Sequence, residues 1–172
     1  MTRTTYAFAL LAIAAALAIT GCGSSGSSTS TSGNSDGSST AIENAPAGAE
    51  SGVAVLTVAR APKAGPVLVN AEGFTVYDFH KDKGTTSSCY GACAKVWPPV
   101  LTAGAPTAGE GAMSSKLGTT KRKDGSVQAT YAGHPLYTYV ADKKPGEANG
   151  NDFSSFGAQW YALHGNGEEA GD

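Results

Sequence analysis

The sequence has 172 residues, a formal net charge of −2 and 15% charged side chains. No run of lysine and arginine is longer than residues 121–123, so the chain lacks the concentrated positive charge of a nucleic-acid-binding protein. Its length excludes several large independent domains and leaves room for one ordinary domain beside the N-terminal segments.

The first 21 residues predict a lipoprotein signal peptide. Arg3 precedes a nearly unbroken apolar run over 6–19, which is too short to anchor a protein in a bilayer about 30 Å thick. Residues 19–22 read Ile-Thr-Gly-Cys, the bacterial lipobox pattern in which small residues precede a cysteine that receives a diacylglycerol. We therefore expect a signal peptide over 1–21 and lipidation of Cys22, with an ordinary secretory signal as the alternative.

Residues 22–50 predict a flexible linker between the lipid and a folded domain. Residues 23–40 are almost all serine, glycine and threonine, which bury too little apolar surface to offset the entropy of ordering. A linker of this composition and length reaches roughly 30 Å on average. The combination predicts a protein of the bacterial cell envelope on the extracytoplasmic side of a membrane, which it contacts through the lipid on Cys22.

Cysteine usage agrees with that location. The chain has three cysteines, and lipidation of Cys22 leaves Cys89 and Cys93 as a pair in an oxidising compartment, where a disulfide is expected. Their spacing of one helical turn places the two Cα atoms about 6 Å apart, within disulfide range. We expect the bridge to fix the loop that delivers Trp97 to the core. A redox or metal role for the pair is the alternative.

Residues 51–166 predict one small, mainly β domain, followed by a flexible tail over 167–172. Turn residues at 70–73 and at Asp124-Gly125 predict two hairpins. A short helix over 89–96, ended by two prolines, would make the fold α+β. Strands are expected from β-branched and aromatic content at 53–59, 67–69, 74–80, 117–123, 127–131, 136–140 and 160–163, with loops at 102–115 and 142–155.

Two segments of this domain repeat each other. Residues 71–82 align without gaps on residues 131–142. We expect repeat one over about 66–101 and repeat two over about 117–165, in a pseudo-symmetric domain and not a long solenoid. The alignment pairs Tyr77 with Tyr137, Phe79 with Tyr139 and Asp82 with Asp142, and Trp97 parallels Trp160 after a three-residue drift.

The repeated motifs, Tyr-x-Phe-x-x-Asp at 77–82 and Tyr-x-Tyr-x-x-Asp at 137–142, resemble those of a bacterial lipoprotein family. It is the family with a Yx(FWY)xxD motif, also called the secreted repeat of unknown function. The Cys-x-x-x-Cys to Trp-Pro-Pro segment at 89–99 and the Gly-His-Pro-Leu-Tyr run at 133–137 are also similar to its pattern. The resemblance covers about 66–165 and implies an envelope location, with no established activity.

The motif residues have a functional and a structural interpretation. Asp82 and Asp142 could bind a cation, but both lie where a strand reverses, so we expect them to cap turns. The aromatic side chains could line a groove, but we expect them in the core of a small β domain. These aromatic residues are Tyr77, Phe79, Trp97, Tyr131, Tyr137, Tyr139, Trp160 and Tyr161.

The three histidines, His80, His134 and His164, are the candidate metal ligands. With Met113 or the cysteines they could supply a copper or haem site. Their positions give no two-ligand spacing, and Phe74 stands in repeat one where repeat two has His134, so we expect no symmetric site. We predict no cofactor, with copper or haem as the alternative.

No Ser/His/Asp or Cys/His catalytic grouping and no glycine-rich phosphate loop follows from the spacing. We therefore predict a lipid-anchored envelope protein that acts as a non-enzymatic binding or structural module. The alternative is an extracytoplasmic redox or metal protein that uses Cys89 and Cys93 together with the histidines.

Overall fold

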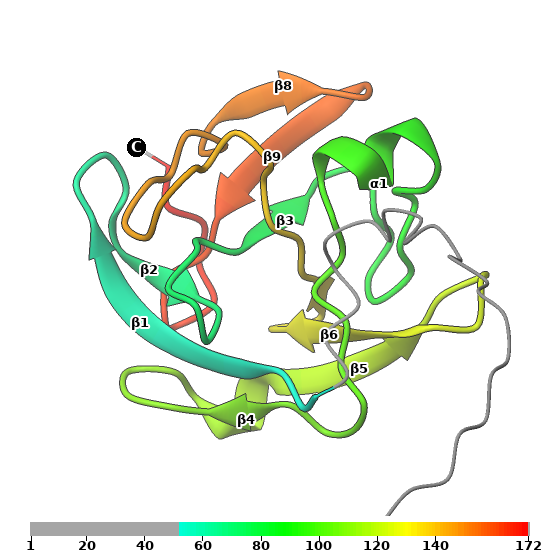
Figure 1. The fold of residues 1–172 in the computed structure, drawn as a ribbon, viewed down its shortest axis with the longest axis horizontal. Helices are drawn as coiled ribbons and strands as arrows, with labels where there is room; N and C mark the ends of the chain where they lie inside the picture. The colour runs from blue at the N-terminus through cyan, green and yellow to red at the C-terminus, as the bar shows by residue number, and fades with distance from the viewer. Residues whose placement is uncertain (1–51, 172) are drawn as a thin grey trace, which may run out of the picture. The chain divides into compact units, whose positions relative to one another are not determined.

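Short strands dominate residues 52–171, the part of the chain that the computed structural model describes (Figure 1). The mainly β prediction is confirmed, and so is the short helix. The predictions for the signal peptide, Cys22 and the linker to residue 50 fall outside the described residues. In chain order the elements are β1 (Val55–Ala61), β2 (Gly65–Val69), β3 (Tyr77–Phe79), α1 (Ala92–Val96), β4 (Thr107–Ala108), a 3-10 turn (Ser114–Lys116), β5 (Leu117–Lys121), β6 (Val127–Tyr131), β7 (His134–Pro135), β8 (Phe153–Ser155) and β9 (Ala158–Ala162).

The strands form three small sheets, in the orders β2–β1–β4, β3–β9–β8 and β5–β6–β7. Neighbours are antiparallel except β1 and β4, which run parallel. β4 lies inside 102–115, which the sequence predicts as an irregular loop. Thr107 pairs with Val55 and Ala108 with Leu56. A two-residue strand that pairs with a distant segment leaves no periodic signal in the sequence.

The β5–β6 hairpin forms where the sequence predicts it. Gly125 takes a φ of 88°, a left-handed conformation that glycine adopts without the steric cost of a Cβ. Asp124 closes the turn, because its carboxylate accepts hydrogen bonds from the backbone N–H and the hydroxyl of Ser126 at 3.0 and 2.5 Å. Local turn chemistry therefore sets the register of these two strands.

The hairpin predicted around residues 70–73 forms at its turn and at the residues next to it, where Val69 bridges Thr75 and the N–H of Val76 donates to the carbonyl of Leu68 at 3.0 Å. The backbone N–H of Gly73 donates to the carbonyl of Asn70 at 3.0 Å. From Tyr77 onward the partner changes, because β3 pairs with β9 and Phe79 lies opposite Trp160. All three residues of β3 are buried, although β3 is the edge strand of its sheet, and its other side is joined to Tyr137 by a single bridge (Figure 1).

The strand predicted over 136–140 is replaced by the two-residue β7 and by single bridges. Tyr137 bridges both Tyr77 and Pro99. Tyr77 and Tyr137 exchange two backbone hydrogen bonds of 2.8 and 2.9 Å, and the exchange joins the two repeats at equivalent positions. No continuous strand forms over 136–140, because the pairing partner changes at Tyr137.

Residues 167–171 differ from the flexible tail that the sequence predicts. Glu169 forms a bridge with Leu163, and the N–H of Ala170 donates to the carbonyl of Ala162 at 2.7 Å. Ala170 is buried. The segment therefore lies against the end of β9 and carries Glu169 to the surface beside β3.

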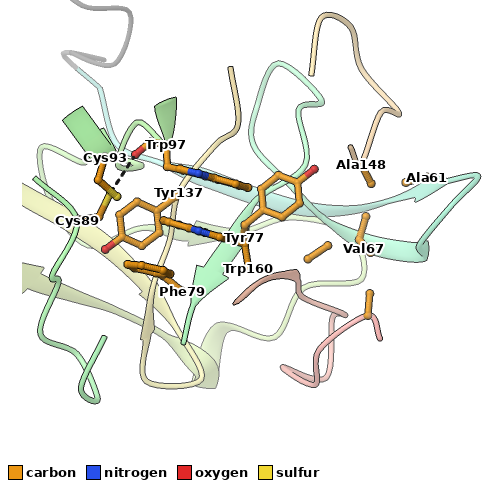
Figure 2. Packing of buried hydrophobic residues seen from close by; sticks show 12 residues of the cluster. Ala61, Val67, Tyr77, Phe79, Cys89, Cys93, Trp97, Tyr137, Ala148 and Trp160 are labelled. Carbon is orange, nitrogen blue, oxygen red and sulfur yellow. Dashed lines mark hydrogen bonds between the residues drawn. A yellow bond between two sulfur atoms is a disulfide. The ribbon is translucent and has the colours of Figure 1, made fainter. Parts of the chain in front are cut away.

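Two clusters of buried apolar side chains form the core. One contains five aromatic side chains and both cysteines of the disulfide (Figure 2). The other is mainly aliphatic and includes Leu56, Leu68, Leu136 and Leu163. Within residues 52–171, no helix has the length and apolar character that crossing a membrane requires.

Candidate functional site

The tyrosines and aspartates of the two motifs bond across the repeats. The hydroxyl of Tyr77 donates to Asp142 Oδ2 at 2.6 Å, and the hydroxyl of Tyr137 donates to Asp82 Oδ2 at 2.6 Å. Each repeat thus supplies the donor to the aspartate of the other repeat. The spacing within each motif matters because one strand must present a tyrosine inward and then reverse at the aspartate.

The same aspartates also cap turns, as the sequence predicts. Asp82 Oδ1 accepts from the backbone N–H of Ser88 at 2.7 Å, and Asp142 Oδ1 accepts from the backbone N–H of Asn149 at 2.9 Å. Burial raises the pKa of Asp142, while the hydrogen bond from Tyr77 opposes that rise. Both motif aspartates are therefore engaged by the fold.

Burial and the bonded aspartates also act on the two tyrosines. Burial first, then the hydrogen bond to its aspartate, raises the pKa of Tyr77 far above the ordinary value, and the same causes raise the pKa of Tyr137. Both phenols remain protonated donors across the physiological pH range. Their role is structural, since a donor that never ionises holds the partner carboxylate at every working pH.

Four aromatic rings from the two repeats form one stack in the core. Ring centroids lie 4.1 Å apart for Tyr139 and Trp97, 3.9 Å for the two tryptophans and 3.9 Å for Trp160 and Phe79. Figure 2 shows Trp97, Trp160 and Phe79 lying face to face. Each tryptophan therefore stacks on the motif aromatic of the other repeat. Of the eight aromatic residues predicted to form the core, six are buried in it, and Tyr139 is half-buried against it. The prediction is wrong for Tyr161, which lies outside both clusters.

The disulfide between Cys89 and Cys93 is present, with its Cα atoms 5.2 Å apart. It closes the segment that leads into α1, after which the N–H of Trp97 donates to the carbonyl of Cys93 at 2.8 Å. A buried arginine, Arg122, holds the other end by donating from Nη2 to the carbonyl of Cys89 at 2.7 Å. The bridge thus positions Trp97 for the stack, as the sequence predicts.

Arg122 is a buried residue that the sequence interpretation missed. Its guanidinium also donates to Ser87 Oγ at 2.9 Å and to Gln128 Oε1 at 2.6 Å, and it lies 4.4 Å from the centre of the Tyr90 ring. In the sequence it appears as the middle of a basic run beside a turn, which is typical of an exposed hairpin. Only the fold shows that its side chain turns inward.

The three candidate histidines do not converge. His164 Nδ1 lies 2.6 Å from the carbonyl oxygen of Pro66. His80 and His134 instead flank Asp78 on β3. Among residues 52–171, the group of closely spaced metal-capable side chains is Asp78, His80 and Glu169, and it contains no cysteine.

Asp78 forms the floor of this group. Its side chain is 1% exposed, and neither carboxylate oxygen has a hydrogen-bond partner of good geometry, although the backbone N–H of Tyr161 is near enough to lower the pKa of Asp78. His134 Nδ1 lies 3.2 Å from Asp78 Oδ2, close enough for an ion pair, although the geometry does not make a hydrogen bond. On the other side, His80 Nε2 lies 2.7 Å from Glu169 Oε1. We call these four residues, Asp78, His80, His134 and Glu169, the Asp78 cluster.

The Asp78 cluster is buried at its floor and open at its rim. The side chains of His134, His80 and Glu169 are 45%, 42% and 37% exposed. Burial first, and then the negative charge of Glu169, raises the pKa of Asp78 to about 6, while the two histidines oppose the rise. A group of two imidazoles and two carboxylates at an open rim can receive a cation from solvent.

Part of the Asp78 cluster is visible in the sequence. The alternation of a strand predicts Asp78 and His80 on one face, since they are two residues apart. The structure buries Asp78 in spite of its charge and adds His134 from β7. Glu169 lies in the predicted tail, so no sequence signal places it here.

The positions equivalent to Asp78, His80 and His134 in the other repeat carry no charged or imidazole side chain. The offset between the repeats places Thr138, Val140 and Phe74 where Asp78, His80 and His134 stand. All three of these equivalents line one cavity of about 290 Å³. The pseudo-symmetric fold therefore forms without charged groups at this position.

Comparison with known proteins places the fold in a family. Residues 58–101 and 118–164 match the family described as a secreted repeat of unknown function, one match for each repeat. No curated protein and no solved structure matches the chain significantly. The family description fits an extracytoplasmic module of unknown activity, and the matched segments span more than half of the sequence. The chain belongs to this family of secreted repeats.

Proposed function

We propose that the protein is a lipid-anchored, non-enzymatic binding module of the bacterial cell envelope, with the Asp78 cluster as its binding site. The observation that carries this proposal is the buried carboxylate of Asp78, neither oxygen of which accepts a hydrogen bond, beside two half-exposed histidines of which His134 lies 3.2 Å from Oδ2. The motif residues of both repeats, in contrast, are engaged with one another. The motif residues therefore hold the fold together, and the Asp78 cluster is the group left available to bind a ligand.

A non-enzymatic role is supported by the surroundings of the nucleophilic and basic side chains. Both cysteines of residues 52–171 are joined in a disulfide. His80 contacts Glu169, His134 contacts Asp78 and His164 contacts a backbone carbonyl, so none of them is paired with a serine or thiol nucleophile in this part of the chain. A nucleophile held by its base is what acyl transfer would need.

The lipid anchor is supported by the sequence over 19–22 and by the serine- and glycine-rich composition that follows it. A diacylglycerol together with any further acyl chain holds a protein on a membrane durably, because at least two chains are buried. The anchor places the binding domain within the reach of the linker from the membrane surface.

Membrane fractionation of cells that express the full-length chain tests this anchor. We expect the wild type in the membrane fraction and Cys22→Ala in the periplasm or medium. Ser24→Ala, two residues further along the chain, is the control and should remain with the membrane. If Cys22→Ala stays in the membrane fraction after a high-salt wash, the anchor at Cys22 is wrong.

A further inference from the structure

We infer that the Asp78 cluster binds one divalent transition-metal ion, with Asp78, His80, His134 and Glu169 as its ligands. This inference rests on the proposed binding role of the cluster and names its ligand class. Its support comes from the distances between the ligand atoms, from the buried carboxylate and from the difference between the two repeats.

The first support is the spacing of the ligand atoms. A tetrahedral site with bonds of about 2.1 Å separates its ligand atoms by about 3.4 Å. His134 Nδ1 and Asp78 Oδ2 are 3.2 Å apart, and His80 Nε2 and Glu169 Oε1 are 2.7 Å apart. The ligand atoms of Asp78, His80 and Glu169 all lie within 4.8 Å of one another. Asp78, His80 and Glu169 can thus converge on one ion through small side-chain rotations, whereas His134 lies near Asp78 alone and has to turn further to reach the same ion.

The second support is the unpaired carboxylate of Asp78. A buried acceptor without a donor is unfavourable, and here a second carboxylate, that of Glu169, stands nearby. A bound cation would satisfy the oxygens of Asp78 and remove the repulsion between the two negative charges. The half-exposed histidines would leave a path for the ion from solvent.

The third support is the contrast between the repeats. At the equivalent position the same scaffold holds Thr138, Val140 and Phe74, none of which is a charged or imidazole ligand. Folding alone therefore does not call for an aspartate and two histidines. These side chains are placed together on one side of a pseudo-symmetric domain only.

The donor atoms favour one class of metal. Imidazole nitrogens suit zinc, copper and nickel, whereas magnesium and calcium prefer sites made entirely of oxygen. Two nitrogens and two carboxylate oxygens match the four-coordinate preference of Zn²⁺. The disulfide cysteines supply no thiolate, so a soft, sulfur-rich site is not formed here.

Isothermal titration of the full-length mature protein, solubilised in detergent and stripped with a chelator, tests the inference with Zn²⁺ as the probe. We expect one Zn²⁺ per chain and no saturable binding of Mg²⁺ or Ca²⁺. His134→Phe and His80→Val introduce the residues of the equivalent positions and should weaken Zn²⁺ at least about 10- to 100-fold, because the loss of even an outer-shell partner costs that much. His164→Ala, outside the cluster, should leave the affinity unchanged.

Two results would overturn the inference. One is the absence of stoichiometric Zn²⁺ binding by the wild type, and the other is unchanged affinity in His134→Phe and His80→Val. Asp78→Thr is the variant that should still fold, because threonine occupies the equivalent position, 138, in the other repeat. We expect it to unfold cooperatively in chelator, at a temperature no lower than the wild type, and to lose the upward shift that Zn²⁺ gives the wild type. A retained shift would count against Asp78 as a ligand.

Failure of the metal inference is distinguishable from failure of the proposed anchor. The titration reports on the domain in detergent and does not depend on where the protein resides. A wild type that binds no Zn²⁺ yet fractionates with membranes through Cys22 would refute the metal ion and leave the anchor standing. Zn²⁺ binding by a chain whose Cys22→Ala variant stays in the membrane would refute the anchor alone.

Discussion

At the residue scale, the motif tyrosines and Asp78 differ in how their buried polar atoms are paired. The buried phenol oxygens of Tyr77 and Tyr137 each have an aspartate partner, so their burial costs little. Asp78 is just as buried but accepts no hydrogen bond, and the half-exposed His134 lies 3.2 Å from its Oδ2. The first arrangement stabilises the fold, whereas the second depends on the ionisation state of the carboxyl or on a ligand.

The raised pKa of Asp78 predicts how the stability of the metal-free protein depends on pH. Burial raises the pKa from 3.8 to about 6, so between these values the folded protein retains a proton that the unfolded chain releases. The free energy of unfolding should therefore fall as the pH rises through this window, by about 3 kcal/mol for a shift from 3.8 to about 6. Urea unfolding in chelator at pH 4 to 7 measures the fall, which should be smaller in Asp78→Asn.

Asp124→Asn is the matched control for this measurement. Hydrogen bonds from Ser126 lower the pKa of Asp124, so its contribution is present at neutral pH and is lost on acidification. Asp124→Asn should thus change the pH profile in the opposite sense, and only at the acid end of the range, where the carboxyl of the unfolded chain begins to bind a proton. A profile of Asp78→Asn that is parallel to the wild type over the whole range would contradict the prediction for Asp78.

The crossed tyrosine–aspartate pairs predict the effect of removing single hydroxyls. Tyr77→Phe and Tyr137→Phe each leave a motif aspartate without its 2.6 Å donor, at a cost of about 1–3 kcal/mol. The cost for Tyr77→Phe should be larger at pH 7 than at pH 4, because a neutral Asp142 needs the donor less. Tyr139→Phe is the control, since the Tyr139 hydroxyl makes no hydrogen bond among residues 52–171, and it should stay within about 0.5 kcal/mol. Equal losses in all three variants would contradict the prediction.

At the element scale, local signals were readable from the sequence and long-range pairings were not. The Asp-Gly turn fixes β5 and β6, and the short helix before Pro98 appears as α1. The pairing of β3 with β9 and that of β1 with β4 depend on partners far along the chain, and the sequence favoured local partners instead. The candidate site divides in the same way, because alternation joins Asp78 to His80 while Glu169 comes from a segment without any pattern.

The loop that follows Asp142 packs on the aromatic stack, and a glycine permits its close approach. A Cβ added at Gly150 would lie 2.7 Å from Trp97, closer than real contacts allow, and 3.0 Å from Tyr77, which is tighter than most contacts. We expect Gly150→Ala to destabilise the domain by about 1–3 kcal/mol, because the stacked rings have no free space to move into. Thermal unfolding measures this. Gly52→Ala, where an added Cβ meets nothing within 4 Å, is the control and should be nearly neutral.

At the scale of the whole molecule, the two repeats form a single cooperative unit. Every shared feature crosses between them, namely the paired tyrosine backbones, the two tyrosine–aspartate bonds and the stack of four rings. A repeat by itself would expose its tryptophan and leave its motif tyrosine without a partner. The family motif thus specifies the contacts that join the two repeats. It does not specify the residues of the Asp78 cluster, which differ from those at the equivalent positions of the other repeat.

This mutual fit predicts that neither repeat folds alone. Fragments 52–110 and 111–172 divide the domain between the repeats, and each alone would lose the apolar burial that offsets chain entropy. We expect little chemical-shift dispersion in the NMR spectrum of either fragment and native-like dispersion when the two are mixed in equal amounts. The intact chain cut by a protease after residue 110 is the control and should keep its fold, because both halves remain in contact. Cooperative unfolding of one isolated fragment would show that the crossed contacts are dispensable, and the Tyr77→Phe and Tyr137→Phe penalties should then be small as well.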